Sequence, residues 1–123
     1  MALTGKEILE FTEQDGVSWV VPLENLDFEF ADEMKEQLMS YIQQGHKRLA
    51  FDLSKSEFID SMGLGVLMIA FAHLRTQSGG RLALFGASEE VLEVLKLTAL
   101  KGQGILFKSK DEAEQFMRHG NLN

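Results

Sequence analysis

Polar and hydrophobic positions near the start of the chain follow a pattern typical of two short strands. An apolar segment around Leu9 leads into the turn signal Glu13 to Gly16, and a second apolar run begins at Val17. Pro22 ends this run because proline has no N–H group for the ladder of a sheet. Residues 7–22 therefore predict a β-hairpin.

The pattern changes to helical spacing over residues 28–44. Phe30, Met34 and Leu38 recur every four residues with charged positions between them, which is typical of an amphipathic helix. Gly45 is expected to end this helix in a left-handed conformation.

Short apolar strands and helical patterns then alternate to the end of the chain. Strands are predicted at residues 47–53, 81–85 and 104–107, and helices from about 62–77, from 88–97 and after a cap at Asp111. The order ββαβαβαβα predicts an α/β fold, with a mixed, mostly parallel sheet and right-handed crossovers. We expect a single domain over residues 1–123.

An acid and a hydroxyl, Asp60 and Ser61, stand where a strand gives way to the most apolar helix. The first N–H groups of a helix have no partner within it, so a serine there can act as a cap, and the same place accepts an anion. Ser61 is therefore interpreted either as a helix cap or as a site of modification.

The helix after Ser61 carries two glycines and apolar side chains on nearly every face. Gly63 and Gly65 each cost roughly 1 kcal/mol relative to alanine, which indicates that a backbone or a partner comes close. The apolar side chains include Met62, Leu64 and Met68. This surplus predicts that part of the helix is deeply buried or is kept for a partner.

The motif Phe58-Ile59-Asp60-Ser61-Met62-Gly63-Leu64-Gly65, with residues 51–53 before it and 79–84 after it, resembles the STAS domain. It is most similar to the small stand-alone anti-sigma factor antagonists. In that family the serine after the aspartate of the D-S-x-G-L-G motif is phosphorylated, and it corresponds to Ser61 here. The resemblance implies that the partner-binding residues are Asp27, Asp60, Ser61, Met62, Gly63, Leu64, Gly65 and Met68.

The chain departs from the family pattern at three positions. Glu24 replaces the glycine of a Gly-x-Leu-Asp motif that otherwise matches, Ala99 replaces the glycine of Thr-Gly-Leu, and Met62 replaces a small hydroxyl residue. The resemblance implies that Asp27 lies near Ser61. The alternative is an ordinary charged residue approaching a helix start.

The resemblance also implies a function without catalysis by this chain. The unphosphorylated protein would bind an anti-sigma factor that is a serine kinase, phosphorylation of Ser61 would release it, and a serine phosphatase would restore binding. STAS-like domains also serve as scaffolds in stressosome-type assemblies and as accessory subunits of transporters. In such a role Ser61 would be only a cap.

Composition narrows the classes of partner and cofactor. The 123 residues carry a formal net charge of −7, which argues against nucleic acid or an anionic membrane as a partner, and there is no cysteine. His46, His73 and His119 lack metal-ligand spacing, so they are interpreted as surface residues without a metal. No nucleotide-binding motif or nucleophile–base pair is present, and we expect no cofactor and no enzymatic activity.

The longest apolar run, residues 62–72, is shorter than the roughly 20 residues that cross a bilayer. Without such a segment or a signal peptide, we expect a soluble cytoplasmic protein without membrane insertion.

A response-regulator receiver is a further alternative, in which Asp60 itself would be phosphorylated. That chemistry needs an acidic pair after the first strand and a late lysine. Asp15 lies in the predicted hairpin turn, and Lys108 alone is suitably placed. We rank this alternative below the STAS interpretation.

Overall fold

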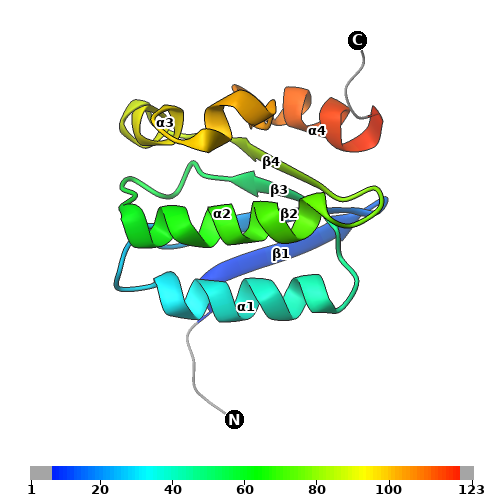
Figure 1. The fold of residues 1–123 in the computed structure, drawn as a ribbon, viewed down its shortest axis with the longest axis horizontal. Helices are drawn as coiled ribbons and strands as arrows, with labels where there is room; N and C mark the ends of the chain where they lie inside the picture. The colour runs from blue at the N-terminus through cyan, green and yellow to red at the C-terminus, as the bar shows by residue number, and fades with distance from the viewer. Residues whose placement is uncertain (1–6, 120–123) are drawn as a thin grey trace.

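A five-stranded sheet forms the centre of the structure, a computed structural model that describes residues 7–119 (Figure 1). The strands are β1 Leu9–Gln14, β2 Val17–Pro22, β3 Arg48–Asp52, β4 Arg81–Phe85 and β5 Leu106–Phe107. The helices are α1 Ala31–Gln43, α2 Ser61–Arg75, α3 Glu89–Lys96, the 3-10 helix η1 Ala99–Gln103 and α4 Lys110–His119. The predicted order ββαβαβαβα is confirmed.

The strands lie side by side in the order in which they occur along the chain. Among the described strands, β1 and β2 pair antiparallel and the later neighbours pair parallel, so the predicted mixed sheet is confirmed. Gln14 pairs directly with Val17, which leaves Asp15 and Gly16 as a two-residue turn with positive φ angles of 54° and 81°. Hairpin turns of this kind match the twist of the strands, and glycine reaches such angles without strain.

Each central strand contributes side chains to two separate cores because successive residues point to opposite faces. On one face, Leu49 and Phe51 of β3 join a large buried cluster with residues of α1, α2 and α3. Figure 1 shows α1 and α2 running next to each other along the strands. On the other face, Ala50 joins a smaller cluster with Ala113 and Met117 of α4.

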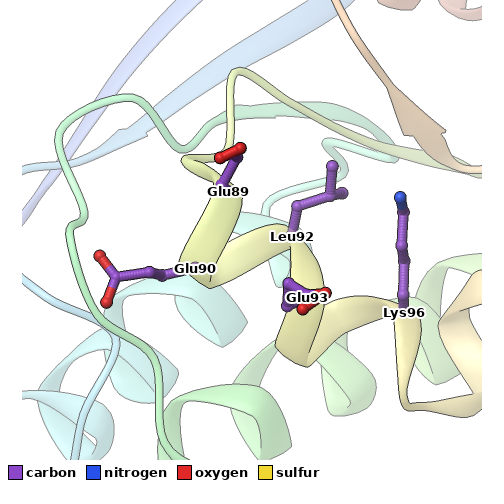
Figure 2. Close-up of a pocket in the computed structure, with 5 residues that line it drawn as sticks. All are labelled: Glu89, Glu90, Leu92, Glu93 and Lys96. Carbon is purple, nitrogen blue, oxygen red and sulfur yellow. The ribbon is translucent and has the colours of Figure 1, made fainter.

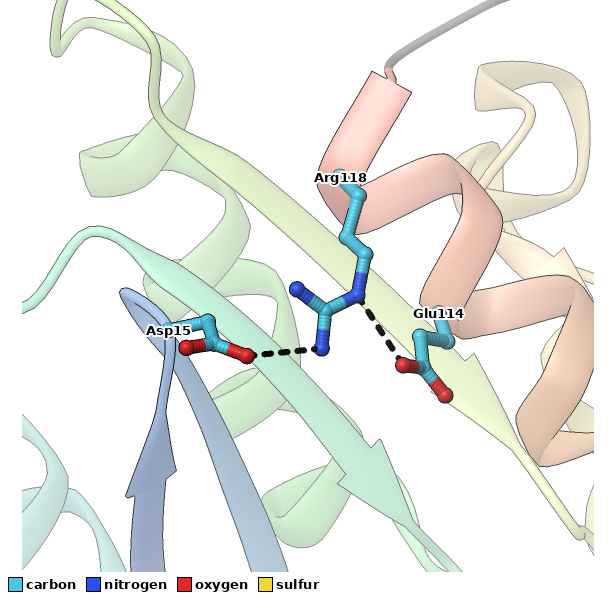
Figure 3. Close-up of polar contacts among 3 residues, drawn as sticks. All are labelled: Asp15, Glu114 and Arg118. Carbon is cyan, nitrogen blue, oxygen red and sulfur yellow. Dashed lines mark hydrogen bonds and ion pairs between the residues drawn. The ribbon is translucent and has the colours of Figure 1, made fainter.

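An ion-pair chain ties α4 to the far end of the hairpin. Arg118 lies 3.4 Å from Asp15 in the hairpin turn and 2.9 Å from Glu114, one helical turn earlier in α4 (Figure 3). The neighbouring carboxylates raise the pKa of Arg118, mainly through the hydrogen bond that Arg118 Nε donates to Glu114. Lys110 lies 4.8 Å above the ring of Trp19, so α4 is held at both ends.

Several predicted boundaries were wrong for local reasons. The first helix begins at Ala31, not near residue 28, because Asp27 organises a preceding turn: its carbonyl accepts from the N–H of Phe30 and Ala31. The last strand starts at Leu106, not at residue 104, because Gly104 adopts a left-handed φ of 70° after η1.

The predicted cap of the last helix was also wrong. Asp111 lies inside the first turn of α4, and Ser109 accepts the hydrogen bond from the N–H of Glu112 at 3.2 Å. By contrast, Ser88 caps α3 as predicted, accepting from the N–H of Val91 at 3.2 Å.

No helix within residues 7–119 combines the length and the apolar character that a membrane-spanning segment would need.

Candidate functional site

Two loops meet at the edge of the sheet where the parallel strands end. The loop after β2, residues 23–30, and the loop after β3, residues 53–60, join through a parallel bridge between Leu26 and Ile59. The N–H of Leu26 donates to the carbonyl of Phe58 at 3.0 Å, and the N–H of Asp60 donates to the carbonyl of Leu26 at 3.0 Å. The first loop is thereby held against the start of α2.

Asp60, and not Ser61, caps α2. Its backbone is extended, and one carboxylate oxygen accepts from the N–H of Met62 at 2.9 Å and of Gly63 at 3.1 Å. The second oxygen accepts from the N–H of Phe28 at 3.0 Å. The interpretation of Ser61 as the cap was therefore wrong, because the residue before it already satisfies two free N–H groups of the helix.

The same hydrogen bond bears on the predicted position of Asp27. Phe28, the residue after Asp27, donates its N–H to the Asp60 carboxylate, so Asp27 stands in the loop that contacts the cap of α2. One Asp27 oxygen accepts from the N–H of Glu29 at 3.1 Å. Asp27 thus shapes the turn that presents Phe28 beside Asp60.

Opposing effects set the pKa of Asp60. Partial removal of the carboxyl from water raises the pKa, whereas the hydrogen bonds from the N–H groups of Gly63, Phe28 and Met62 lower it. The hydrogen bonds outweigh the desolvation, so the pKa lies below its ordinary value. The cap is consequently a carboxylate at neutral pH.

The stability that Asp60 contributes is expected to be complete at neutral pH and to be lost in acid. Its pKa is lower in the folded chain than in the unfolded chain, where it is about 3.9. The contribution is therefore present above the unfolded pKa and disappears as the pH falls through the folded one.

Asp60→Asn isolates this effect, because asparagine also caps helices but does not titrate. Unfolding in urea should show the variant to be less stable than the natural protein at pH 7, with a smaller difference at pH 3. The same difference at both pH values would contradict this account.

Ser61 is the first residue of α2, and its side chain is exposed. Its hydroxyl makes no hydrogen bond with any other residue in the described part of the chain, 7–119. A free hydroxyl at the surface is open to a modifying enzyme, whereas a capping hydroxyl would already be engaged.

The two glycines of the motif have different surroundings. Gly63 is buried, and a Cβ atom there would lie 1.9 Å from the carbonyl oxygen of Leu26. A Cβ on Gly65 would meet nothing within 4 Å. The close backbone approach that the glycines predict therefore occurs at Gly63, against the chain's own loop, while Gly65 lies next to open space.

The remaining predicted residues lie on one side of α2. Ser61, Leu64, Gly65 and Met68 are three, four and seven residues apart, which places them on one helical face. Leu64 packs partly against the core, whereas Met62 is 52% exposed and Met68 is 40% exposed. The structure thus places Leu64 and Met68 on the same helical face as the free Ser61 hydroxyl, with Met62 next to it in sequence.

Sequence reasoning missed two aromatic residues beside them. Phe28 is 75% exposed and Phe58 is 53% exposed, although both are large and apolar. The alternation of Phe58 with buried Ile59 was the available signal for an outward-facing side chain. We call Phe28, Phe58, Ser61, Met62 and Met68 the Ser61 surface.

A shallow groove adjoins this surface between α1 and α2. It has a volume of about 190 Å³, and Ser61, Met62 and Gly65 line it from α2. Its other lining residues are Ala31, Asp32, Lys35, Val66 and Ile69. The carboxylate of Asp32 and the ammonium group of Lys35, both on α1, thus lie across the groove from the Ser61 hydroxyl.

The receiver-like alternative is not supported by this arrangement. Asp15 lies in the turn before β2, so it is at the opposite end of the strands from Asp60, and it is paired with Arg118. Lys108 follows β5 and lies at the same end of the strands as Asp60. One of the expected acidic partners is therefore far from the residue that would be phosphorylated.

The histidines differ in their surroundings. His73 and His119 are exposed, as predicted, but His46 is half-buried. Its ring stacks on Tyr41 with centroids 3.8 Å apart, and its Nδ1 lies 3.3 Å from a carboxylate oxygen of Glu13. This stack closes the end of α1 against the hairpin.

Comparisons with a family model, with known sequences and with solved structures all indicate the same protein family. Residues 9–113 match the family model of the STAS domain. An anti-sigma-B factor antagonist of Listeria monocytogenes is 36% identical over 75 residues, which are 61% of this chain and 65% of that protein. The chain thus matches just under two thirds of the length of this relative. A candidate anti-sigma factor antagonist of Thermotoga maritima is 30% identical over 85% of this chain and 92% of its own.

Solved structures agree with this match. A crystal structure of a candidate anti-sigma factor antagonist from Thermotoga maritima superposes with a TM-score of 0.84 and 28% identity, covering 90% of this chain and 95% of that one. The antagonist SpoIIAA in its unphosphorylated form gives a TM-score of 0.75 at 18% identity, covering 94% of this chain and 99% of its own. SpoIIAA is also known in a phosphorylated form. At this identity the likeness to SpoIIAA concerns the fold alone.

Proposed function

This chain belongs to the STAS domain family, and on that basis we propose that it is an anti-sigma factor antagonist controlled by phosphorylation of Ser61. The observation that carries the proposal is the exposed Ser61 hydroxyl, which makes no hydrogen bond with residues 7–119. The names of the Listeria and Thermotoga relatives support the same role.

In the unphosphorylated state the Ser61 surface docks on a partner anti-sigma factor that is a serine kinase. Four large apolar side chains of this surface, from the two loops and from α2, are between 40% and 75% exposed. Water removed from these side chains on docking would stabilise the complex by about 25 cal/mol per Å² of buried apolar area. Binding would hold the anti-sigma factor away from its sigma factor.

Phosphorylation would reverse this docking through charge. The kinase transfers the terminal phosphoryl group of ATP to the Ser61 oxygen, which loses its proton, and ADP leaves. The new group adds about 1.5 to 2 negative charges. Asp60 already occupies the N–H groups of Met62 and Gly63, so the helix start has no free capacity at these two positions to hold a second anion.

The magnitude of this effect is sufficient for a switch. The phosphate would stand beside the Asp60 carboxylate and next to a groove that Asp32 and Lys35 both line, so one lysine faces two carboxylates and the phosphate there. Bringing such a group against an apolar partner surface without a compensating cation would cost about 3 kcal/mol, or roughly a hundredfold in affinity. A serine phosphatase would restore binding, and this chain itself would carry out no catalytic step.

Mass spectrometry of the protein isolated from its own cells tests this function. We expect one phosphate, on Ser61, in a fraction of the molecules, and none in a Ser61→Ala variant expressed in the same cells. The unphosphorylated fraction should copurify with the kinase. Stable copurification with a transporter or a stressosome-type complex, with no phosphate on Ser61, would instead favour the scaffold or subunit role.

A further inference from the structure

A second groove lies between α3 and the edge strand β5, on a different part of the molecule from the Ser61 surface. Its volume is about 280 Å³. Leu84 of β4 and Leu95 of α3, both buried, lie among its lining residues and form its floor. The groove therefore reaches down to the main core.

The walls of this groove are apolar and only partly covered. Leu92 of α3 lines it on one side and Leu106 of β5 on the other, both at intermediate burial. Phe107 also borders the groove, but its ring packs on Phe116 of α4, on the opposite face of the sheet. β5 pairs only with β4 in the described sheet, so no further strand within residues 7–119 covers the groove from the β5 side.

Two lysines complete the lining. Lys96 and Lys108 are exposed, and neither ammonium group has an ion-pair partner among the described residues. Only the backbone N–H of Lys108 is engaged, with Glu112 at 3.1 Å. Two unpaired cations beside one apolar groove are notable in a chain with a net charge of −7.

The acidic residues of α3 line an adjoining depression and not the groove itself. Leu92 and Lys96 project to the same side of α3, as does Glu89, whereas Glu90 projects away from them (Figure 2). A wider depression of about 490 Å³ is lined by Glu89, Glu90 and Glu93 together with Leu92 and Lys96, and the last two also line the groove. Lys96 thus borders both depressions, and none of the three carboxylates lines the groove.

We propose that this groove binds a small amphiphilic anion, a medium-chain fatty acid whose carboxylate meets Lys96 and Lys108 and whose alkyl chain lies along Leu92, Leu95 and Leu106. The proposal does not depend on the Ser61 switch. The volume corresponds to about nine water molecules at roughly 30 Å³ each, close to the ten non-hydrogen atoms of octanoate. Apolar pockets with a few convergent polar groups are the usual form of small-molecule sites.

Titration with octanoate, below its micelle concentration and followed by ¹H–¹⁵N NMR, tests the proposal. We expect saturable shifts at the backbone amides of Leu92, Lys96, Leu106 and Phe107, and none at Phe28 or Met62. Octanol, which has the same chain without the charge, should bind at least about tenfold more weakly because the hydrogen bonds to the ammonium groups are missing.

Charge reversal supplies the matched variants. Lys96→Glu and Lys108→Glu should each weaken octanoate binding by about tenfold or more. Lys101→Glu makes the same charge change at an exposed residue outside the groove, and it should leave the affinity within about twofold. Non-saturable shifts, equal binding of octanol, equal effects of all three variants, or shifts centred on the Ser61 surface would each overturn the proposal.

Discussion

Ser61→Asp is expected to lower the affinity for the partner anti-sigma factor by at least about tenfold while leaving the fold intact. The variant places a permanent negative charge where the proposed phosphate forms, although with about half of its charge. The domain should tolerate this charge because Ser61 is exposed to water in the first turn of α2, where a helix-dipole contribution of about 0.3–1 kcal/mol offsets part of the repulsion from the Asp60 carboxylate. The partner surface has no such compensation.

Isothermal titration calorimetry with the purified partner measures the affinity, and urea unfolding checks the fold. Ser61→Asn is the matched control, because asparagine has nearly the same shape as aspartate but no charge. This variant should bind the partner much more tightly than Ser61→Asp. Ser61→Ala should bind but accept no phosphate. Equal affinities of the Asp and Asn variants would show that charge at this position does not control docking.

The apolar part of the same contact can be tested separately. Phe28→Ser should weaken binding by about tenfold or more, since an exposed aromatic side chain at the centre of an interface commonly contributes over 1 kcal/mol. Leu97→Ser is the matched control: Leu97 is 87% exposed, but it follows α3 and lies outside the Ser61 surface. If both variants weakened binding equally, the contact would not be centred on Phe28.

Gly63→Ala is expected to destabilise the protein by about 3 kcal/mol, the upper part of the range for overpacking a well-packed site. The added Cβ would lie 1.9 Å from the carbonyl oxygen and 2.3 Å from the carbonyl carbon of Leu26. These are backbone atoms in the Leu26–Ile59 bridge, so relief requires the loop itself to move. The same movement would displace Phe28 from Asp60.

Gly65→Ala is the control on the same helix. Nothing lies within 4 Å of a Cβ at this position, so the variant should gain about 0.5–1 kcal/mol from the higher helix propensity of alanine. Urea unfolding at neutral pH compares the two variants directly. Equal stability of both would mean that α2 can shift away from Leu26 at little cost.

Much of the architecture could be predicted because it depends on local patterns. The period of the apolar residues identified the strands and helices, and the Asp15-Gly16 turn identified the hairpin. The motif around Ser61 identified the family. The ends of the helices were predicted less accurately, as at Asp27 before α1 and Ser109 before α4, because side-chain and backbone hydrogen bonds compete there over one or two residues.

The sequence by itself determined the order of the elements and placed an aspartate and a serine at the start of α2. The tertiary structure decided which of the two residues caps the helix. The Asp60 carboxylate also accepts a hydrogen bond from the N–H of Phe28, which lies in a loop 32 residues earlier. Exposure of Phe28 and close contact at Gly63 have the same origin. Both arise where two loops meet through the Leu26–Ile59 bridge, a contact between distant segments that no local pattern encodes.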